Sequence, residues 1–480
     1  MNRLFNTVNL LAKRPVPRSL IGNLSHYSTN VSARVRGVSR AQILAAFLLV
    51  GGAAAISTTE QECPTESAFT KMTDEELVKR ILEIKTENPD NIMASVFDLD
   101  YYNSLPADLK SRLLKCCASG AYNSDSSMGC YANMPDDYDT FKPFFSKALE
   151  KYHKVDLSKK KHVNNWSLEG VEGLPANGVL DLAELGLPPL SMRVRTGRNL
   201  KKFPLPASMT KKDRIDMEIQ MGKVFDQLIA DPSFGGKYVS ITPGHPNCVS
   251  KEEYDELVNA HIMFKDMSAD PYLLTAGIAE DWPYGRGCYI SEDKGFIIWV
   301  GEEDHLRIMC MQKGTILNKV FDRLKAAIDV VEDMIPGGCA YNDEFGVVTS
   351  CPTNIGTGMR ASVHIQLPNL TSDGTEKKAK AVAKPLGLSV RGKGGEHTPI
   401  GADGTVDISP SARFCISEAE ILTALYNGIK LLKAEEDKAG VDAAPTVVDT
   451  EGKLLEIQEQ LLNTQKAVLE VQKYILANKK

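Results

Sequence analysis

The sequence lacks the motifs by which many enzymes hold phosphate or metal. There is no GxxxxGK[ST] loop, no HRD-type catalytic loop and no HExxH helix. Ten cysteines are present but form no CxxC pair, and the adjacent Cys116 and Cys117 are poorly placed for a disulfide with each other. We therefore expect free thiols, and we expect arginine side chains to hold any phosphate that the chain binds.

Acidic residues are absent from the first 59 positions, which contain seven arginines and lysines. A basic segment without acids is typical of an organelle transit peptide. Residues 41–56 then form an apolar stretch of sixteen residues, shorter than the roughly 20 that span a bilayer comfortably. We expect a mitochondrial presequence over residues 1–60, with delivery to the intermembrane space or the inner membrane rather than the matrix. A plain matrix presequence and a retained inner-membrane anchor stay open.

The rest of the composition is that of a soluble globular protein, with 43% hydrophobic and 25% charged residues. A chain of 480 residues can hold two or more domains, each with its own core. The net charge of −6 and the pI near 5.9 argue against nucleic acid as a partner.

Residues 65–153 have apolar positions at helical spacing, and Thr73 followed by Glu76 is a capping signal. Residues 154–178 are polar and rich in turn formers, as in a linker. Strand-like runs such as 296–300 follow, and their hairpin-like spacing favours an antiparallel sheet. The expected fold class is α+β: a small all-α N-terminal domain at 65–153, then a large C-terminal domain at 179–435 with an antiparallel sheet flanked by helices.

Residues 436–480 form a separate tail of linker and helix. A connector precedes a segment in which apolar pairs recur every seven residues. This spacing predicts either a short coiled coil, which would make a homo-oligomer, or a helix that docks on its own domain. In either case we expect no catalytic residue in the tail.

Several arginines stand in distinctive contexts. Arg193 and Arg195 are two apart on a predicted strand and therefore share one face. Arg307 follows an acidic run, Arg360 follows the turn CPTNIGTGM, and Arg391 precedes a glycine-rich stretch. Guanidinium groups bind phosphate oxygens through two parallel hydrogen bonds and keep their charge. Taken alone, each of these arginines would be interpreted as a solvated surface residue. Taken together, the motifs in which they lie indicate a phosphate-binding site.

Two carboxylates and a thiol complete the candidate site. Glu303 lies just after the strand 296–300, and Glu396 lies in the glycine-rich loop. Each alone is a plain acidic turn residue, but as a pair they suit a planar guanidinium. Cys351 opens the CPTNIGTG turn, where free N–H groups and a nearby cation are expected to lower its pKa.

Five segments resemble the motifs of the phosphagen kinases, the ATP:guanidino phosphotransferases, in order and spacing. They are RVRTGRN at 193–199, WPYGRGCY at 282–289, WVGEEDHLRI at 299–308, CPTNIGTGMRASVHI at 351–365 and VRGKGGEHT at 390–398. The resemblance covers about residues 70–435. One departure is Gly301, where the family usually has asparagine, and we expect a local change in that turn.

The resemblance implies ATP as a substrate, with Mg²⁺ bound through ATP and no protein ligand assigned to the metal. It implies that Glu303 and Glu396 hold the guanidino group with Cys351 beside it. The residues it places around the nucleotide phosphates are Arg193, Arg195, Arg307, Arg360 and Arg391.

The segment 119–133, with Ser126 and Tyr131, resembles the short specificity loop of arginine kinases, and Tyr152 also resembles that group. Ser127 and Met128 depart from it. The resemblance favours reversible phosphorylation of arginine for energy buffering, with taurocyamine as the alternative substrate. A protein-arginine kinase is disfavoured because the helical domain suits a small-molecule site. A non-catalytic membrane scaffold is disfavoured because the motifs are intact.

Overall fold

The computed structural model describes residues 72–392, 400–401 and 403–442. These belong to the second of two compact units, 1–71 and 72–480. The predicted presequence, Glu396 and the predicted C-terminal helix lie outside the described residues. Among those described, no helix has both the length and the apolar character needed to cross a bilayer.

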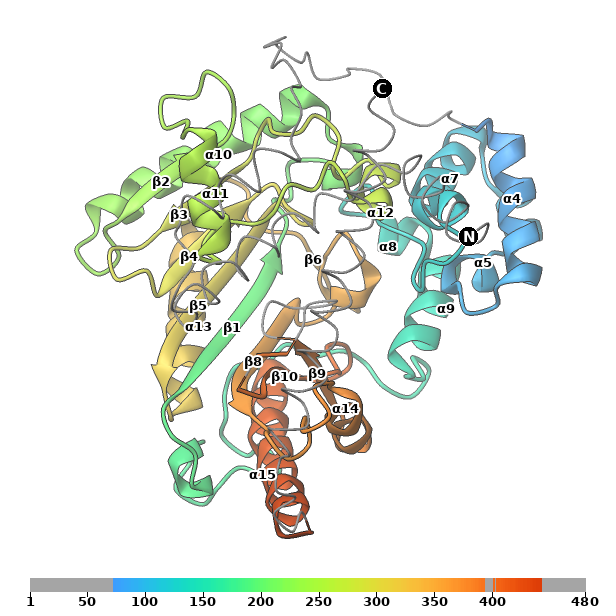
Figure 1. Ribbon diagram of the computed structural model, residues 1–480. Coiled ribbons are helices and arrows are strands. Elements are labelled where there is room, and N and C mark those ends of the chain that lie inside the picture. Colours follow the sequence, from blue (N-terminus) through green and yellow to red (C-terminus); the bar gives the residue numbers. More distant parts are fainter. Residues whose placement is uncertain (1–71, 393–399, 402, 443–480) are drawn as a thin grey trace, which may run out of the picture. The chain divides into compact units, whose positions relative to one another are not determined.

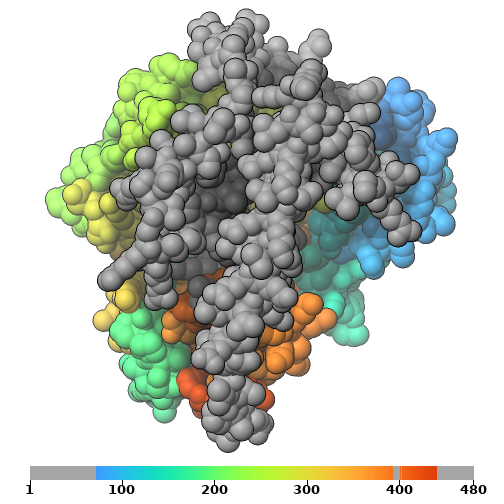
Figure 2. Space-filling model, viewed as in Figure 1, coloured from blue at the N-terminus to red at the C-terminus, as the bar shows by residue number. Residues whose placement is uncertain are grey.

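Residues 74–153 fold into a cluster of helices. Thr73 Oγ1 accepts a hydrogen bond from the backbone N–H of Glu76, and the Glu76 carboxylate accepts one from that of Thr73, which confirms the predicted capping box. Figure 1 shows the helices in blue and teal, and Figure 2 shows the same residues as the blue and teal part of the surface. Their bounds are α4 (Asp74–Glu87), α5 (Ile92–Val96), α6 (Leu99–Ser104), α7 (Ala107–Tyr122), α8 (Asp137–Thr140) and α9 (Lys142–His153).

An eight-stranded sheet forms the centre of the larger region. Its strand order is β2–β3–β4–β5–β1–β8–β10–β9, and each neighbouring pair is antiparallel. The predicted α+β fold class is therefore confirmed. The strands are β1 (Leu190–Arg198), β2 (Lys237–Ser240), β3 (Gly287–Ile290), β4 (Phe296–Val300), β5 (Leu306–Gly314), β8 (Met359–Gln366), β9 (Leu388–Gly392) and β10 (Thr405–Pro410), and a separate pair comprises β6 (Tyr341–Asn342) and β7 (Gly346–Val347).

Three long helices cover one face of this sheet. α10 (Lys211–Ala230) packs on β2, α13 (Leu317–Met334) on β1 and β5, and α15 (Glu418–Asp442) on β8 and β10. Their apolar side chains share one core with the sheet. The shorter elements are α11 (Lys251–Asn259), α12 (Pro271–Thr275), α14 (Lys377–Ala383), and the 3₁₀ turns η1 (Leu182–Leu185), η2 (Pro206–Ser208), η3 (Pro352–Asn354) and η4 (Lys384–Leu386).

The helical cluster packs against loops of the larger region. Its core takes in Phe345, Cys351 and Phe414 from those loops. The Ala132 N–H donates to the Ser350 carbonyl at 2.8 Å. The segment that precedes η3 is thus held directly against the helical cluster, which places Cys351 at their junction.

α15 extends further than the sequence analysis expects. It continues to Asp442, so residues 436–442 are helical where a connector was expected to begin. Glu436 explains this difference. Its buried carboxylate accepts the backbone N–H groups of Asn369 and Leu370 at 2.7 and 2.9 Å, which ties the last turns of the helix to the domain.

Three histidines predict how stability depends on pH. Burial lowers the pKa of His153 and His162 to about 4 and that of His305 to about 3. The unfolded chain therefore binds protons below about pH 6.5 that the folded chain does not bind. The histidine contribution to the free energy of unfolding is expected to fall as pH falls from about 6.5 toward 4, while Glu303, whose pKa is raised to about 7, acts in the opposite sense; urea denaturation across that range measures the sum.

His153→Gln is the variant that tests this dependence. The His153 ring nitrogen Nε2 lies 2.9 Å from the Pro352 carbonyl, and a glutamine amide can donate in its place. The variant should show a shallower fall in stability over the same pH range. An unchanged slope would show that His153 does not contribute to it.

Candidate active site

A pocket of about 510 Å³ brings together most of the residues that the sequence marks as functional. Arg193 is absent from its lining, and Glu396 lies outside the described residues. The lining includes Asp125 and Tyr152 as well. The predicted site residues that line it are Ser126, Tyr131, Arg195, Glu303, Arg307, Cys351, Arg360 and Arg391.

Strand alternation explains why the arginines meet. Met192 and Val194 of β1 point into the helix-covered core, so Arg193 and Arg195 lie on the opposite face of the sheet. The same reasoning applies to the three other strands, because their core residues flank the arginines: Leu306 and Ile308 in β5, Met359 and Ala361 in β8, and Val390 in β9. Arg307, Arg360 and Arg391 therefore share that face with the β1 pair.

The strand register brings two of these cations together. Arg195 lies opposite Arg360 in the pairing of β1 with β8. Burial, and then the charges of neighbouring arginines, lower the pKa of Arg195 well below its ordinary value. Burial lowers the pKa of Arg360 to about 9, and Asp407 opposes that shift. So many positive charges in one pocket make it a strong site for a multiply charged anion.

Asp407 on β10 neutralises part of this charge. Its side chain is buried, and its Oδ2 accepts a hydrogen bond from Arg360 Nη2 at 2.8 Å. It is also the charge that most favours the cationic form of Arg193. Asp407 therefore fixes the direction of Arg360 and lies close to Arg193 as well. Arg193 is therefore linked to the other arginines through Asp407, although its side chain does not line the pocket.

A carboxylate pair lies beside the arginines. Glu302 contacts Arg307 through both oxygens, at 2.9 and 2.8 Å, and Glu303 contacts it at 3.5 Å. Burial opposes the charge of Arg307, but Glu302 and Glu303 raise its pKa above the ordinary value. Arg307 thus lies at the border between the cationic and the acidic part of the pocket.

Glu303 is the carboxylate with the perturbed acidity. Burial, and then the negative charge of Glu302, raise the pKa of Glu303 to about 7. Asn354 Nδ2 donates to Glu303 Oε2 at 3.2 Å. A carboxyl group that titrates near neutral pH inside a pocket is suited to proton transfer.

The expected low pKa of Cys351 is wrong for this structure. Burial, and then the negative charge of Glu303, raise the pKa of Cys351 well above its ordinary value. Its Sγ lies 3.1 Å from Thr353 Oγ1, which only partly opposes these effects. The thiol is therefore neutral in the protein without ligand.

Gly301 occupies a left-handed turn position that favours glycine. Its φ is +74°, a left-handed conformation that asparagine also tolerates better than most residues. A Cβ atom at Gly301 would lie only 2.5 Å from the carbonyl oxygen of Gly285. Glycine in place of asparagine thus keeps the conformation of the turn, and it leaves room for the backbone of Gly285, just before β3, to lie against Gly301.

The loop between α7 and α8, which carries Ser126, forms one wall of the pocket. The Ser126 hydroxyl accepts the Gly129 N–H at 3.0 Å, which shapes the loop. Asp125 accepts a hydrogen bond from Tyr272 of α12 at 2.9 Å, which links the helical cluster to the larger region. Burial raises the pKa of Tyr131 well above its ordinary value, so its phenol stays neutral.

Three residues of the site were not singled out from the sequence. Asn354 lies inside a recognised motif but carries no charge that marks it. Asp407 and Arg413 lie outside the recognised motifs. An acid on a strand gives no signal until the strand register places it opposite an arginine.

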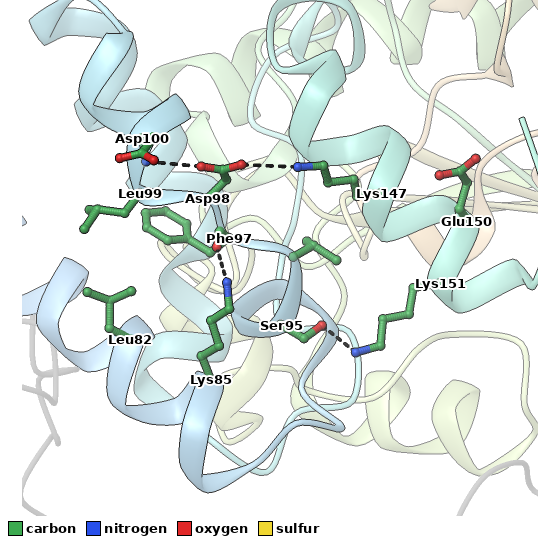
Figure 3. A pocket seen from close by; sticks show the side chains of 11 residues that line it. Leu82, Lys85, Ser95, Phe97, Asp98, Leu99, Asp100, Lys147, Glu150 and Lys151 are labelled. Atoms are coloured by element: carbon green, nitrogen blue, oxygen red, sulfur yellow. Dashed lines mark hydrogen bonds and ion pairs between the residues drawn. The ribbon is translucent and has the colours of Figure 1, made fainter. Parts of the chain in front are cut away.

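A second pocket, of about 680 Å³, lies in the helical cluster (Figure 3). Its lysines already have partners there. Lys85 Nζ donates to the Phe97 carbonyl at 2.7 Å. Lys147 Nζ contacts Asp98 at 3.3 Å. None of the predicted functional residues lines this pocket, so the candidate active site is the arginine-lined one.

The described residues contain no group of three or more histidine, cysteine, aspartate or glutamate side chains set to hold a metal ion. Of the carboxylates at the candidate site, Glu302 and Glu303 contact Arg307.

Two family models match the sequence. Residues 216–439 match "ATP:guanido phosphotransferase, C-terminal catalytic domain". Residues 87–150 match "ATP:guanido phosphotransferase, N-terminal domain". An arginine kinase of Polybetes pythagoricus is 35% identical over 338 residues, which cover 70% of this chain and 89% of that protein. An arginine kinase of Limulus polyphemus is 36% identical over 329 residues, covering 68% and 86%.

Solved structures show the same likeness. The duplicated taurocyamine kinase of Schistosoma mansoni superposes with a TM-score of 0.65 at 30% identity, covering 78% of this chain. This chain spans half the length of that duplicated protein. A lombricine kinase structure superposes with a TM-score of 0.61 at 24% identity over 74% of this chain and 94% of its own, a likeness of fold.

Proposed function

This chain belongs to the ATP:guanido phosphotransferase family, and from that premise we propose that it transfers a phosphoryl group reversibly between ATP and arginine. The observation that carries the proposal is one pocket lined by two kinds of group. The cations Arg195, Arg360 and Arg391 line it, and we take them as one end; Glu303, which interacts electrostatically with Cys351, lines it too, and we take this pair as the other end. Triphosphate suits the first end and a guanidinium suits the second.

The arginine end would bind the nucleotide phosphates. Phosphoryl transfer asks the protein mainly for alignment of two substrates and for neutralisation of charge on the transferring group. Holding both substrates in line removes roughly 7–11 kcal/mol of the barrier. In this pocket Arg307 contacts Glu303, so it joins the two substrate subsites.

The acidic end would bind and deprotonate the guanidino group. A guanidinium cation placed against Glu303 favours the carboxylate form of that side chain. As the attacking nitrogen forms its bond to the γ-phosphorus, the bond from phosphorus to the ADP oxygen breaks. The proton released by the nitrogen passes to Glu303, whose pKa of about 7 suits the transfer in both directions. Glu396 stays a predicted partner in this step.

Mg²⁺ would enter with ATP and would supply charge neutralisation at the phosphates. The arginines that would share this neutralisation of the phosphates are those of the sheet, and their positions are set by the strands. We assign no protein ligand to the metal.

Asp125 favours arginine over taurocyamine as the substrate. It lines the same pocket as Glu303 and Cys351, on the wall formed by the helical cluster. Arginine carries an α-ammonium group that a carboxylate attracts, whereas taurocyamine carries only a sulfonate at that end. The named relatives at 35% and 36% identity are arginine kinases, which supports the same choice.

A substrate panel tests the proposal. The full chain is assayed for ADP formation with arginine, taurocyamine, creatine, glycocyamine, lombricine and agmatine. We expect the highest kcat/KM with arginine. Agmatine, which keeps the ammonium but lacks the carboxylate, should exceed taurocyamine. A higher kcat/KM with taurocyamine would overturn the choice of arginine, and no turnover with any guanidine would overturn the function.

Cys351→Ala is expected to lower kcat without abolishing it. The thiol becomes useful as an anion only when a guanidinium lies against it, so its loss removes one charge-assisted contact. Such a contact is worth about 1.5–3 kcal/mol, on the order of tenfold to a hundredfold in rate. Steady-state kinetics with arginine measure the change. Wild-type turnover in the variant would show that the thiol has no electrostatic role.

We also propose a mitochondrial location, in the intermembrane space or at the inner membrane. Its support is the acid-free, basic composition of residues 1–59. Import of the radiolabelled full chain into isolated mitochondria, followed by swelling and protease treatment, tests it. Failure of import, or protection that survives rupture of the outer membrane, would contradict the proposal.

A further inference from the structure

Arg413 is a charged residue of the pocket to which the proposed reaction assigns no part. It follows β10 and lines the same pocket as Glu303 and Cys351. Its backbone carbonyl accepts hydrogen bonds from both the N–H and the hydroxyl of Thr357, at 3.1 and 3.0 Å. The next residue, Phe414, stacks on His162 with ring centroids 5.5 Å apart. Arg413 is thus fixed firmly in place.

The side chain of Arg413 contacts Asn354. Its Nη1 donates to Asn354 Oδ1 at 2.7 Å, and its Nε is buried without a hydrogen-bond partner among the described residues. A guanidinium can only donate hydrogen bonds, so the atom of Asn354 that faces Arg413 must be the amide oxygen. The NH₂ end of the same amide must then face the other way.

The other side of Asn354 faces Glu303. Asn354 Nδ2 donates to Glu303 Oε2 at 3.2 Å. The backbone N–H of Asn354 donates to the Cys351 carbonyl at 3.0 Å, so its main chain is also held. The three side chains therefore form a directed series in which each group fixes the orientation of the next.

We propose that Arg413 is a positioning residue that acts through Asn354 to keep Glu303 as an oriented carboxylate, ready for the guanidino group. The proposal rests on the proposed function for its catalytic consequence, but the orientation of Glu303 is a property of the free protein. Without Arg413 the Asn354 amide can turn over and present its oxygen to Glu303. That oxygen repels a carboxylate and favours the protonated acid.

Other charged groups also influence whether Glu303 is a carboxylate or a protonated acid. Arg307 and Arg413 favour its carboxylate form, whereas Glu302 and Asp304 oppose it. Cys351 and Tyr131 also lie within electrostatic range. The variants below leave all of these groups in place except Arg413 itself.

The first test compares pH profiles of kcat/KM for arginine. Arg413→Met removes the donor, and the acid limb should move up by about one pH unit, with about a fivefold loss at pH 7 and about a tenfold loss well below it. Arg413→Lys keeps a donor and should largely restore the profile. The KM for ATP should change less than about twofold in both, since a donor acting on Glu303 leaves phosphate binding alone.

Asn354 variants separate the series from a direct effect of the Arg413 charge. Asn354→Ala keeps the charge but removes the amide, and the acid limb should still move up. Asn354→Asp places oxygen toward Glu303 and should move it further. An unmoved limb in both Asn354 variants would overturn the proposal, because Arg413 would then act on Glu303 directly. Arg323→Met, at an ion pair with Asp293, is the matched control and should change nothing.

The second test does not use activity. Glutamate labelled with ¹³C at the carboxyl is incorporated into the full chain, and the Glu303 signal is identified by its loss in Glu303→Gln. Its titration midpoint should rise in Arg413→Met and in Asn354→Asp. An unmoved midpoint would overturn the positioning role even if arginine is phosphorylated. A moved midpoint in a protein that phosphorylates no guanidine would keep the positioning role while the proposed function fails.

Discussion

Replacing Arg360 by alanine is expected to lower kcat by about 10²–10³-fold, the usual effect of removing one group that stabilises charge in the transition state. Arg360 lies opposite Arg195 in the pairing of β1 with β8, and its side chain is oriented by Asp407. The loss should be seen in the forward and the reverse direction. Turnover close to wild type would refute the phosphate-binding role of the cluster.

The Arg360 variant needs a control for folding. Removing the arginine leaves the Asp407 carboxylate buried and without its main partner, which typically costs about 3–5 kcal/mol of stability. The double variant Arg360→Ala/Asp407→Asn removes that isolated charge. Its thermal midpoint should return toward that of Asp407→Asn alone, while its kcat stays low. If kcat recovered together with the thermal midpoint, the low kcat of the single variant would result from impaired folding and not from the loss of a group that contacts substrate.

Replacing Glu303 by glutamine is expected to lower kcat/KM for arginine by about 10²–10⁴-fold, because the amide cannot accept the proton. The wild-type profile should show a matching limb. Below pH 7 the Glu303 carboxyl becomes neutral and loses its attraction for the guanidinium. The value of kcat/KM should therefore rise with pH, reach half of its maximum near the Glu303 pKa of about 7, and level off above that pH.

The pH profile of the Glu303→Gln variant makes the assignment specific. The acid limb near pH 7 should be missing from the residual activity. Glu344→Gln, at a surface ion pair with Lys142, is the matched control and should keep both rate and limb. An acid limb that persists in Glu303→Gln would assign it to another group.

The sequence predicts the fold class, and it also predicts that Arg193 and Arg195 share one face of the sheet, for identifiable reasons. The strand predicted at 296–300 is observed as β4 with the same bounds, because an uninterrupted apolar run there fits a buried strand. Arg193 and Arg195 share a face as expected from their spacing. That the three other arginines join them follows from antiparallel pairing, which the hairpin-like spacing indicates.

The parts that the sequence does not give depend on contacts between distant segments. The low pKa predicted for Cys351 is based on Arg360, which is nearby in the sequence. In the folded protein, burial and the charge of Glu303 raise the pKa of the thiol instead. Asp407 acquires its role from the register of β10 against β8. Arg413 acquires its role from a hydrogen bond to Asn354. No periodicity encodes such contacts.

The place of β1 in the middle of the sheet has a consequence for biosynthesis. β1 lies between β5 and β8, which are translated much later. A nascent chain that ends before β8 has the helices of the cluster, but it lacks Phe414 from their core and Arg360 and Arg391 from the pocket. Until then β1 offers unpaired backbone groups on an open edge, a state prone to aggregation on the ribosome. We expect chaperone dependence to be greatest while the ribosome is between β1 and β8, and truncated products of that length to bind no nucleotide.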